Sequence, residues 1–575
     1  MLAVTSGCSR LDEWWLAVQR PAPVTHTEDG DASLLAEPDA EAAPRAVPRH
    51  VRADSPDVVV YGDAGAVSDS SVASDATASG DGAVVAAGPS ITALWVWVPI
   101  YERMEWNGPR VGYFRAGASL RLRVEASVGT GGGCPRGWYE VEGGGFVCLN
   151  RMTTLDPHEL DGRRPNAPDM SQAMPYPYMT TYRPAVMYRW LPSQGDLREV
   201  EPERFAPAGA PAASAPTVAP TTGTGALLTT GPSTATTASS VDGGVGTRAV
   251  AVAPANREQA ADAGVRIEDL QGASGSPLLR RVLAGMYISV DREMASAGRR
   301  FWRTHNGGYI ERGAVSALRS PPTFQGITLD ETHALPMAFM VAFQGSTYDL
   351  SPDGLRVVRR EAAPRLTAYH LASETPVTVG RQAYYRTREG LYLRDRNIRL
   401  VRTSAPPSDV GTSEKWVEVN LDRQMLIAYE GARPVYVTLI SSGRRNRDEP
   451  QRNYETIQGA FRIYSKHVTT TMDGNSAGDG PYSIEDVPWV MYFEGSFALH
   501  GAFWHNLYGY QRSHGCVNMA PADARWVFQW SEPQLPEGWH GVQASERGRP
   551  GTRVYVHYES QALGERGGPR VVPGH

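Results

Sequence analysis

The sequence predicts a mainly β, multidomain protein in which small β-barrels precede a β-sandwich-like domain that contains one helix. Three observations favour this architecture. Short segments alternate apolar and polar residues, a strand–turn–strand pattern recurs along the chain, and the 575 residues include 59 Gly and 43 Pro. A chain of this length is too long for one hydrophobic core, so we expect about three or four folded units joined by linkers.

The charge of the chain is nearly balanced, with 62 acidic and 56 basic side chains and a net charge of −6. A nucleic-acid-binding protein usually carries a basic excess, so no nucleic-acid partner is expected. No segment approaches the ~18 consecutive apolar residues of a membrane-spanning helix, and we expect no transmembrane helix. The sequence gives no indication of the oligomeric state.

Residues 1–90 are expected to form a disordered tether, because from about residue 20 they are mainly Ala, Asp, Ser, Gly and Pro. Met1 to Ser9 form a short apolar run that ends in small residues around Cys8. This run resembles the end of a bacterial lipoprotein signal, although the charged start and most of the apolar region are absent. A lipid anchor on Cys8 and a chance cysteine in a tail are equal alternatives.

Residues 91–155 are expected to form the first β module, with short strands near Leu94, Leu120, Trp138 and Phe146. Two cysteines, Cys134 and Cys148, lie close together in a Gly-rich segment of this module. We expect them to form a disulfide that staples a hairpin and stabilises it by about 3 kcal/mol. A disulfide would place the protein outside the cytosol.

A hairpin pattern recurs after a predicted disordered linker at 206–254. The segment from Trp302 to Ile310 matches the later segment from Tyr385 to Leu393 and, more loosely, the earlier segment from Tyr139 to Val147. Each copy has an aromatic residue, a turn with glycine, and a second aromatic residue before an aliphatic one.

This pattern resembles bacterial SH3-like modules, many of which bind cell-wall peptides. We therefore expect SH3-like modules at 91–155, 275–320 and 365–403. Binding of wall peptides and simple packing of small barrels are equal alternatives for these hairpins.

The last folded unit is expected at 412–558, followed by a tail at 559–575. Alternating segments predict a series of antiparallel strands from Trp416 to the end of the unit near His557. One helix is expected to begin at Pro521, because Pro suits the first helical position and three apolar residues follow at helical spacing: Trp526, Val527 and Trp530.

Two histidines and a thiol lie in one short region of this unit. His514 is two residues before Cys516, and His500 precedes both at a spacing that lets the chain leave along a strand and return along a loop. A cysteine attacks as its thiolate, and a neighbouring imidazole can take the proton and stabilise the charge. Gly515 permits a turn in which backbone N–H groups converge, as an oxyanion hole requires. This arrangement suits acyl transfer.

Two other interpretations compete with acyl transfer. His500, His505, His514 and Cys516 could hold zinc, although their spacings match none of the usual paired-ligand patterns. Cys516 could also be an inert buried residue among hydrogen-bonded histidines. Neither interpretation explains the Ser-His-Gly-Cys run.

The run from Ser513 to Met519, together with His500 and Gly501, resembles the active-site signature of the L,D-transpeptidase family, also called the YkuD domain. Earlier segments are similar to the family's opening hairpin and Gly-x-Phe segment: Trp416 to Leu421, Ile440 to Gly443 and Gly459 to Ile463. The resemblance covers about a quarter of the chain and implies the β-sandwich-like catalytic fold of that family.

Three positions depart from the common family pattern. Asn518 stands where many members have Arg, Ala460 stands where Thr is common, and Ile457 with Gln458 replaces Pro-Thr. We interpret Asn518 as a subtype and expect these departures to affect the substrate rather than the nucleophile.

The resemblance implies a mechanism. Cys516, deprotonated by His500, would attack the carbonyl before the terminal D-alanine of a peptidoglycan tetrapeptide stem, release D-alanine and leave a thioester that an acceptor amine resolves. His514 would orient or polarise the site, and the N–H groups of Gly515 and Cys516 would hold the oxyanion. Asn518 would face the donor peptide. The mechanism requires no metal or organic cofactor.

Further donor contacts are expected at Tyr482 and at Glu494 and Gly495, for which loop packing is an equal alternative. Three arginines could meet stem-peptide carboxylates: Arg444, Arg445 and Arg447. Arginine is abundant throughout this chain, and the three are therefore expected to lie in a solvated loop.

These features predict an L,D-transpeptidase of the periplasm or cell envelope whose partners are peptidoglycan stem peptides. The acceptor amine could be another stem peptide, a D-amino acid or a protein lysine. A thiol carboxypeptidase that uses water, and a scaffold that binds the wall without catalysis, are the alternative functions.

Overall fold

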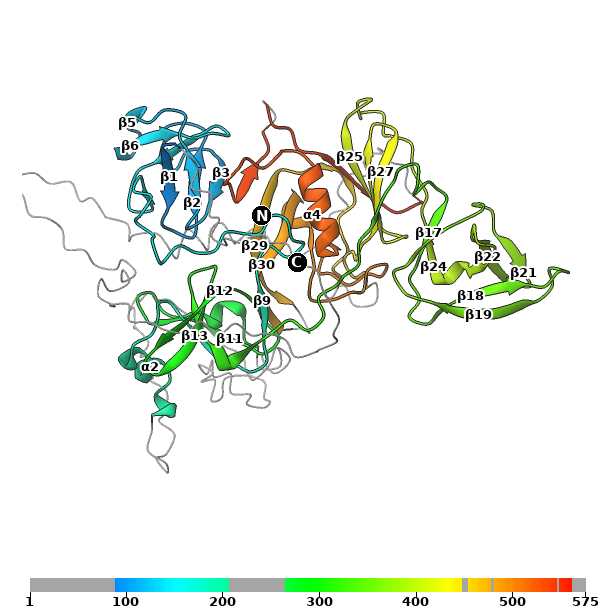
Figure 1. Cartoon of the computed structure of the whole chain (residues 1–575), viewed down its shortest axis with the longest axis horizontal. Coiled ribbons are helices and arrows are strands. Elements are labelled where there is room, and N and C mark those ends of the chain that lie inside the picture. The colour runs from blue at the N-terminus through cyan, green and yellow to red at the C-terminus, as the bar shows by residue number, and fades with distance from the viewer. Residues whose placement is uncertain (1–87, 206–263, 447–452, 477–479, 546–547, 561–575) are drawn as a thin grey trace, which may run out of the picture.

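The computed structural model describes residues 88–205, 264–446, 453–476, 480–545 and 548–560. The linker at 206–254 and Cys8 lie outside the described residues, as do almost all of the tether and nearly all of the tail. The fold is mainly β and consists of several sheets, as the sequence predicts (Figure 1).

The C-terminal unit contains a six-stranded sheet in the order β16-β27-β26-β25-β34-β28. Its strands are β16 (Ile327–Thr328), β25 (Lys415–Asn420), β26 (Met425–Glu430), β27 (Arg433–Leu439), β28 (Gly459–Arg462) and β34 (Arg553–His557). The pairing of β25 with β34 is parallel, whereas the other pairings are antiparallel. The last strand of the described chain, β34, therefore lies inside this sheet, between β25 and β28.

A second sheet faces this one. Its C-terminal strands are β29 (Ser465–Ser476), β30 (Gly480–Glu494), β31 (Phe497–Gly501), β32 (Val517–Met519) and β33 (Gly541–Gln543). The hairpin of β29 and β30 is the longest in the described chain, and it projects towards the second unit defined below (Figure 1). Strands β31 and β32 pair in parallel.

A hydrophobic core fills the space between the two sheets. Val417 and Val556 come from the first sheet, and Trp489 and Leu499 come from the second. Core side chains recur at every second position of a strand, which is the period that directs a strand's residues to one face. The C-terminal unit is thus a β-sandwich.

Helix α4 (Pro521–Trp530) packs against β30 and β31 beside this core. It has Pro at its first position, and Val527 contributes to the core, as the sequence predicts. At its C-terminal end, the buried Lys466 ammonium donates hydrogen bonds to the carbonyls of Phe528 (2.6 Å) and Ser531 (2.7 Å). A lysine from β29 therefore caps the helix that follows the cysteine.

The first unit (residues 88–154) consists of short strands. They are β1 (Ser90–Ala93), β2 (Val98–Tyr101), β3 (Arg110–Phe114), β4 (Ser119–Arg121), β5 (Gly129–Gly131), β6 (Cys134–Glu140), β7 (Phe146–Cys148) and β8 (Thr153–Thr154). Cys134 and Cys148 form a disulfide across β6 and β7, with Cα atoms 5.7 Å apart. Strand β3 pairs with β33, which attaches this unit to the C-terminal unit.

The second unit comprises residues 176–205 and 264–317. Its strands are β9 (Tyr178–Thr181), β10 (Ala185–Tyr188), β11 (Leu278–Val282), β12 (Tyr287–Ser296), β13 (Arg299–Thr304), β14 (Tyr309–Glu311) and β15 (Val315–Ala317). Helix α2 (Gln194–Val200) and the 3-10 turns η1 (Pro202–Arg204), η2 (Ile267–Leu270) and η3 (Arg312–Ala314) complete it. Strand β12 pairs with β30 at Tyr287 and Ile484, so this unit also joins the second sheet.

The third unit (residues 337–400) lies at the opposite end of the molecule (Figure 1). Its elements are β17 (Met337–Met340), β18 (Gly345–Leu350), β19 (Val357–Ala363), β20 (Ala368–His370), β21 (Val377–Val379), β22 (Gln382–Arg386), β23 (Tyr392–Arg394), η4 (Asp395–Asn397) and β24 (Ile398–Leu400). Phe339 packs with Trp416 and Tyr508 in one core cluster, which joins this unit to the first sheet of the C-terminal unit.

The recurring hairpins predicted from the sequence are antiparallel pairs in the structure: β6 with β7, β13 with β14, and β22 with β23. In the second and third units the correspondence extends further, because each hairpin leads into a 3-10 turn and then a strand. None of the sheets formed by the described residues closes into a barrel, so the SH3-like modules stay a prediction.

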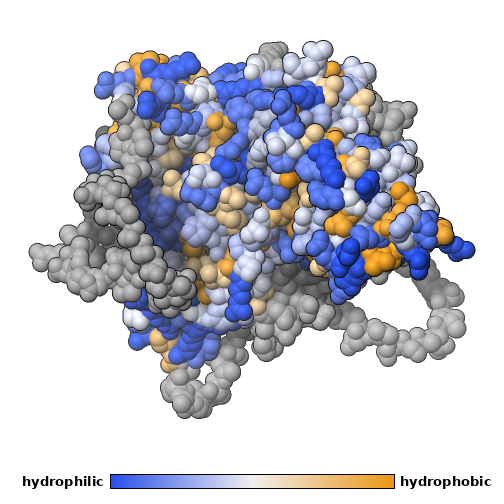
Figure 2. Space-filling view, turned by 45° about the vertical axis from the view of Figure 1, so that its right-hand side comes forward, coloured by the Kyte–Doolittle hydropathy of each residue, from blue (hydrophilic) through white to orange (hydrophobic). Residues whose placement is uncertain are grey.

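The surface of the third unit is turned forward in Figure 2, where apolar and polar residues are mixed. Phe343 and Leu355 are 69% and 75% exposed. Across the described residues, no helix has the length and apolar character needed to cross a membrane.

Candidate active site

Cys516 immediately precedes β32, which pairs in parallel with β31. The register sets Leu499 opposite Val517 and His500 opposite Asn518. Leu499 and Val517 point into the core, so His500 and Asn518 lie on the other face of the two strands. Cys516 is two residues before Asn518 and shares that face. The fold thus brings the predicted thiol and imidazole onto one surface.

Cys516 is half-buried and, among the described residues, is the cysteine that lies outside the disulfide. Its Sγ lies 3.5 Å from the carbonyl oxygen of Ser496, in the turn between β30 and β31. The side chain packs against a small hydrophobic cluster separate from the main core, and Tyr482 and Trp504 pack against the same cluster.

His500 is 2% exposed, and its Nδ1 lies 3.1 Å from the carbonyl oxygen of Gly501. A carbonyl can only accept, so Nδ1 carries the proton and Nε2 keeps a lone pair when the ring is neutral. Burial lowers the pKa of His500 to about 4, although the Gly501 carbonyl acts in the opposite direction. The imidazole is therefore neutral at pH 7 and can accept a proton through Nε2.

The loop before Cys516 is held by hydrogen bonds of its own. The Ser513 hydroxyl donates to the carbonyl of Cys516 and accepts from the N–H of Gly515 at 3.2 Å. Gly515 has φ +129°, and a Cβ there would lie 3.0 Å from the Phe497 ring, so glycine is required. Because the Gly515 N–H already binds Ser513, its predicted role as an oxyanion donor would require this bond to break.

The segment that follows β27 also holds the loop around Cys516 in place. After β27, Ser441 exchanges two backbone hydrogen bonds with Asn518, at 2.8 and 3.0 Å. The buried Thr456 hydroxyl donates to the Gly515 carbonyl at 2.7 Å and accepts from the Gly443 N–H at 2.8 Å. The position of the nucleophile loop therefore depends on residues that lie far earlier in the chain.

His514 is exposed and lies among three side chains. Arg444 Nη2 lies 2.8 Å from His514 Nε2, Tyr454 meets the imidazole edge-on at 4.6 Å, and Tyr482 stacks on it at 5.9 Å. Guanidinium groups only donate, so His514 Nε2 accepts in this contact. The arrangement would hold the His514 ring in one orientation.

The expectation of a solvated arginine loop is wrong for Arg444, which contacts His514 and lies 5.3 Å from the centre of the Tyr454 ring. Arg445 is exposed, 3.4 Å from Glu455, and Arg447 lies outside the described residues. Sequence reasoning could not identify the Arg444 contact, because 70 residues separate it from His514.

Asn518 is 3% exposed, and its Nδ2 lies 2.9 Å from His505 Nε2. Burial first, and then the nearby Arg512 charge, lower the pKa of His505 to about 3. The structure thus directs Asn518 towards a buried neutral histidine. Within the described part of the chain, no three His, Cys, Asp or Glu side chains are grouped to hold a metal ion, so no geometry favours the zinc interpretation.

The weaker sequence candidates also lie near the cysteine. Tyr482 is on β30 and faces His514. Glu494 ends β30, and Gly495 forms the turn to β31 together with Ser496. Gly495 has φ +48°, and its carbonyl accepts a hydrogen bond from Tyr464 at 2.6 Å.

Sequence reasoning missed Trp504, Tyr454 and Thr456. Trp504 stacks on His500 with ring centres 5.8 Å apart. Its position shortly after His500 in an aromatic run is the one signal that could have identified it.

Residues 414–556 match the family model of the L,D-transpeptidase catalytic domain, YkuD. A search of curated proteins finds no match. Several solved structures are similar, each over about a quarter of this chain. A cysteine-to-serine mutant of the Enterococcus faecium L,D-transpeptidase is 22% identical, with 25% of this chain and 50% of that chain covered and a TM-score of 0.19.

An L,D-transpeptidase from Xylanimonas cellulosilytica is 27% identical, with 26% of this chain and 64% of that chain covered and a TM-score of 0.19. L,D-transpeptidase 3 from Mycobacterium tuberculosis is 16% identical, with 29% and 73% covered and a TM-score of 0.20. The chain spans about half to two thirds of the length of the first two structures. Residues 414–556 carry a YkuD-type L,D-transpeptidase catalytic domain.

Proposed function

We propose that the protein is a peptidoglycan L,D-transpeptidase in which Cys516 is the nucleophile and His500 its base. The observation that carries the proposal is the shared strand face of Cys516 and a buried, neutral His500 with Nε2 as its basic atom. A base must be unprotonated at working pH to take the thiol proton. His500 meets this requirement.

In the first half-reaction, the Cys516 thiol gives its proton to His500, and the sulfur forms a bond to the carbonyl carbon before the terminal D-alanine. The tetrahedral intermediate then collapses. Its carbon–nitrogen bond breaks, the leaving amine takes the proton from His500, and a thioester remains on Cys516.

In the second half-reaction, an acceptor amine attacks the thioester and gives its proton to His500. The carbon–sulfur bond breaks, the departing sulfur takes that proton from His500, and both residues return to their starting states. His514, held by Arg444 and Tyr482, would orient the donor peptide at the mouth of the site. The envelope is the proposed location, and the Cys134–Cys148 disulfide supports it because disulfides persist in oxidising compartments.

Replacing Cys516 with Ala in the full chain should abolish D-alanine release from a purified disaccharide-tetrapeptide. His500→Gln should lower kcat at least about 100-fold, since positioned acid–base groups contribute about 10² or more. Mass spectrometry with and without an added amine would separate transfer from hydrolysis. Continued D-alanine release by the Cys516→Ala chain would refute the assignment of the nucleophile.

A further inference from the structure

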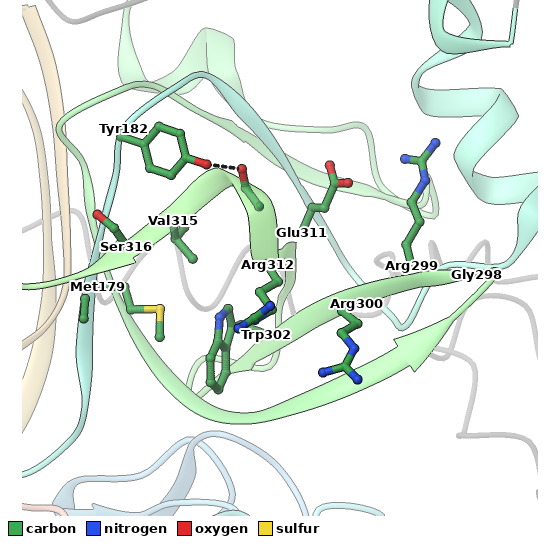
Figure 3. A pocket seen from close by; sticks show the side chains of 12 residues that line it. Met179, Tyr182, Gly298, Arg299, Arg300, Trp302, Glu311, Arg312, Val315 and Ser316 are labelled. Carbon is green, nitrogen blue, oxygen red and sulfur yellow. Dashed lines mark hydrogen bonds between the residues drawn. The ribbon is translucent and has the colours of Figure 1, made fainter. Parts of the chain in front are cut away.

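The second unit contains an open cavity of about 550 Å³, formed between β9, β13 and the segment from η3 to β15 (Figure 3). Met179, Trp302 and Val315 provide apolar lining, and Arg299, Arg300 and Arg312 line it as well. This volume lies in the range of small-molecule and short-peptide sites. Trp302 is half-buried, and Arg300 and Arg312 are exposed at the rim.

The cavity has an excess of positive charge. Glu293 is shared by two arginines, at 2.9 Å from Arg300 and 3.3 Å from Arg312. One carboxylate therefore neutralises only one of the two guanidinium charges. This side of the cavity is positive although the chain as a whole carries a net charge of −6.

The same imbalance recurs at Glu311, which also lines the cavity. It lies 2.9 Å from Arg204 and 3.6 Å from Arg183. Arg204 and Arg299 also pair with Glu201, at 3.2 and 3.1 Å. Five arginines around the cavity therefore face three carboxylates, and the rim keeps an excess of positive charge.

The internal repeat shows that the fold itself does not require these arginines. The third unit repeats β13, β14, η3 and β15 as β22, β23, η4 and β24, in the same order and at a constant sequence offset. At the positions equivalent to Arg299, Arg300 and Arg312 it has Gln382, Ala383 and Asp395. The equivalent of the half-buried Trp302 is Tyr385, which is 5% exposed. The same backbone therefore forms without the basic rim.

We propose that this cavity binds the carboxylate of a short peptide, with Arg300 and Arg312 on the carboxylate and the apolar part of the peptide against Trp302. Guanidinium groups pair with carboxylates through parallel hydrogen bonds, and they stack well beside aromatic rings. The apolar lining favours an organic carboxylate over a free inorganic anion, which would leave Trp302 and Met179 uncovered.

The cavity has a fixed relation to the active site. Met179 on β9 pairs with Ile288 on β12, and Tyr287 on β12 pairs with Ile484 on β30, the strand that also carries Tyr482. A peptide held in the cavity would therefore be held at a constant distance from Cys516. The identification of this peptide as a second stem peptide of the wall polymer rests on the function proposed above.

Calorimetric titration of the full chain would test the site with N-acetyl-L-alanyl-D-glutamate, which has free carboxylates and lacks the D-alanine bond that Cys516 would cleave. Binding to the full chain is expected. The double variant Arg300→Ala with Arg312→Asp introduces the residue types found at the equivalent positions of the third unit. It should weaken binding about 10-fold or more, because a hydrogen bond to a charged group is worth about one decade in affinity.

Three comparisons decide the outcome. Arg396→Ala, at an exposed arginine on η4 of the third unit, is the matched control and should bind as the unchanged chain does. The diamide of the probe peptide should bind about 10-fold more weakly. Inorganic phosphate should bind more weakly than the peptide. Equal binding of the amide, tighter binding of phosphate, or full binding by the double variant would each overturn the proposal.

Separate measurements of melting temperature and D-alanine release distinguish loss of peptide binding from loss of folding or catalysis. Arg300→Gln with Arg312→Gln removes charge but keeps polar side chains, and it should lose binding while its melting temperature stays within a few degrees of the unchanged chain. D-alanine release from a small soluble substrate should persist in all these variants. If the unchanged chain releases no D-alanine, the proposed function fails; if release persists but the peptide does not bind, only the cavity proposal fails.

Discussion

His500 is 2% exposed, and Trp504 forms part of the cover over its ring. The low pKa of this imidazole comes from burial, since the hydrogen bond to Gly501 would raise it. A neutral ring at pH 7 can take a proton at once, whereas a protonated ring could not. The cover over His500 therefore keeps the imidazole neutral to lower pH, although a lower pKa also makes it a weaker base.

Replacing Trp504 with Ala should expose His500 and raise its pKa from about 4 towards its usual 6.5. The base must be unprotonated, so the acid limb of the pH profile should move to higher pH, and activity should fall more at pH 5.5 than at pH 8. The measurement is kcat/KM for D-alanine release across this range. Trp504→Phe keeps an aromatic cover and should retain the original acid limb; an unmoved limb in Trp504→Ala would contradict the argument.

At the residue scale, sequence reasoning could reach His500, His514 and Cys516 because they lie close together along the chain. Arg444 and Thr456 reach the same loop only through folding. Gly443, which precedes Arg444, forms a β-bridge with Ser513, and its N–H binds the Thr456 hydroxyl. No local pattern marks such residues. Family resemblance identified the signature, but it gave no indication that Asn518 would contact His505.

At the scale of elements, each N-terminal unit is joined to the C-terminal sandwich by strand addition or by shared core. Strand β3 adds to β33, with Gly112 opposite Val542 and Tyr113 opposite Gly541. A Cβ on Gly112 would lie 2.3 Å from the Gly541 carbonyl oxygen and 2.4 Å from the Trp539 ring. Side chains larger than hydrogen cannot fit at this junction.

Gly112→Ala should therefore separate β3 from β33 and loosen the first unit without unfolding the sandwich. Faster amide hydrogen exchange in 110–114 and 541–543, with unchanged exchange in β25 and β26, is the expected result. The control is Gly195→Ala in helix α2, where an added Cβ would meet nothing closer than Ser193 Oγ at 3.6 Å and where Ala is favourable. Unchanged exchange at β33 in Gly112→Ala would count against the junction.

Elements with a clear local pattern were predictable, among them helix α4 and the repeated hairpins. The long β29–β30 hairpin was predictable only in its apolar part near Trp489, because polar residues such as Thr469, Glu485 and Asp486 interrupt the alternation. These residues are buried by partners from the first and second units. A strand whose partners come from separate, distant units carries no short-range signal.

At the scale of the whole molecule, Asp486 on β30 connects three units. It accepts hydrogen bonds from Arg115 of the first unit at 2.5 Å, from Ser289 of the second unit, and from Thr469 of its own hairpin at 2.7 Å. Arg115 also donates to the carbonyl of His305 in the second unit at 2.9 Å. The first, second and C-terminal units therefore meet at one buried ion pair, Arg115 with Asp486.

Burial alone would raise the pKa of Asp486, but the Arg115 charge and the hydrogen bonds hold it at about 2, below the ordinary 3.8. A carboxylate whose pKa is lower in the folded state stabilises the fold above the ordinary pKa. This contribution is lost as the pH falls through about 2. The junction should therefore be fully formed at neutral pH.

Asp486→Asn should leave the buried Arg115 guanidinium without its counter-ion, and loss of one partner of a buried pair costs about 3–5 kcal/mol. Because the cost falls on the contacts between units, one cooperative unfolding transition should become two, with the C-terminal sandwich unfolding last. Denaturant titration followed by calorimetry would measure both effects. Asp349→Asn removes an exposed partner of Arg360 and should cost less than about 1 kcal/mol. A single transition of unchanged midpoint in Asp486→Asn would show that the units dock without this ion pair.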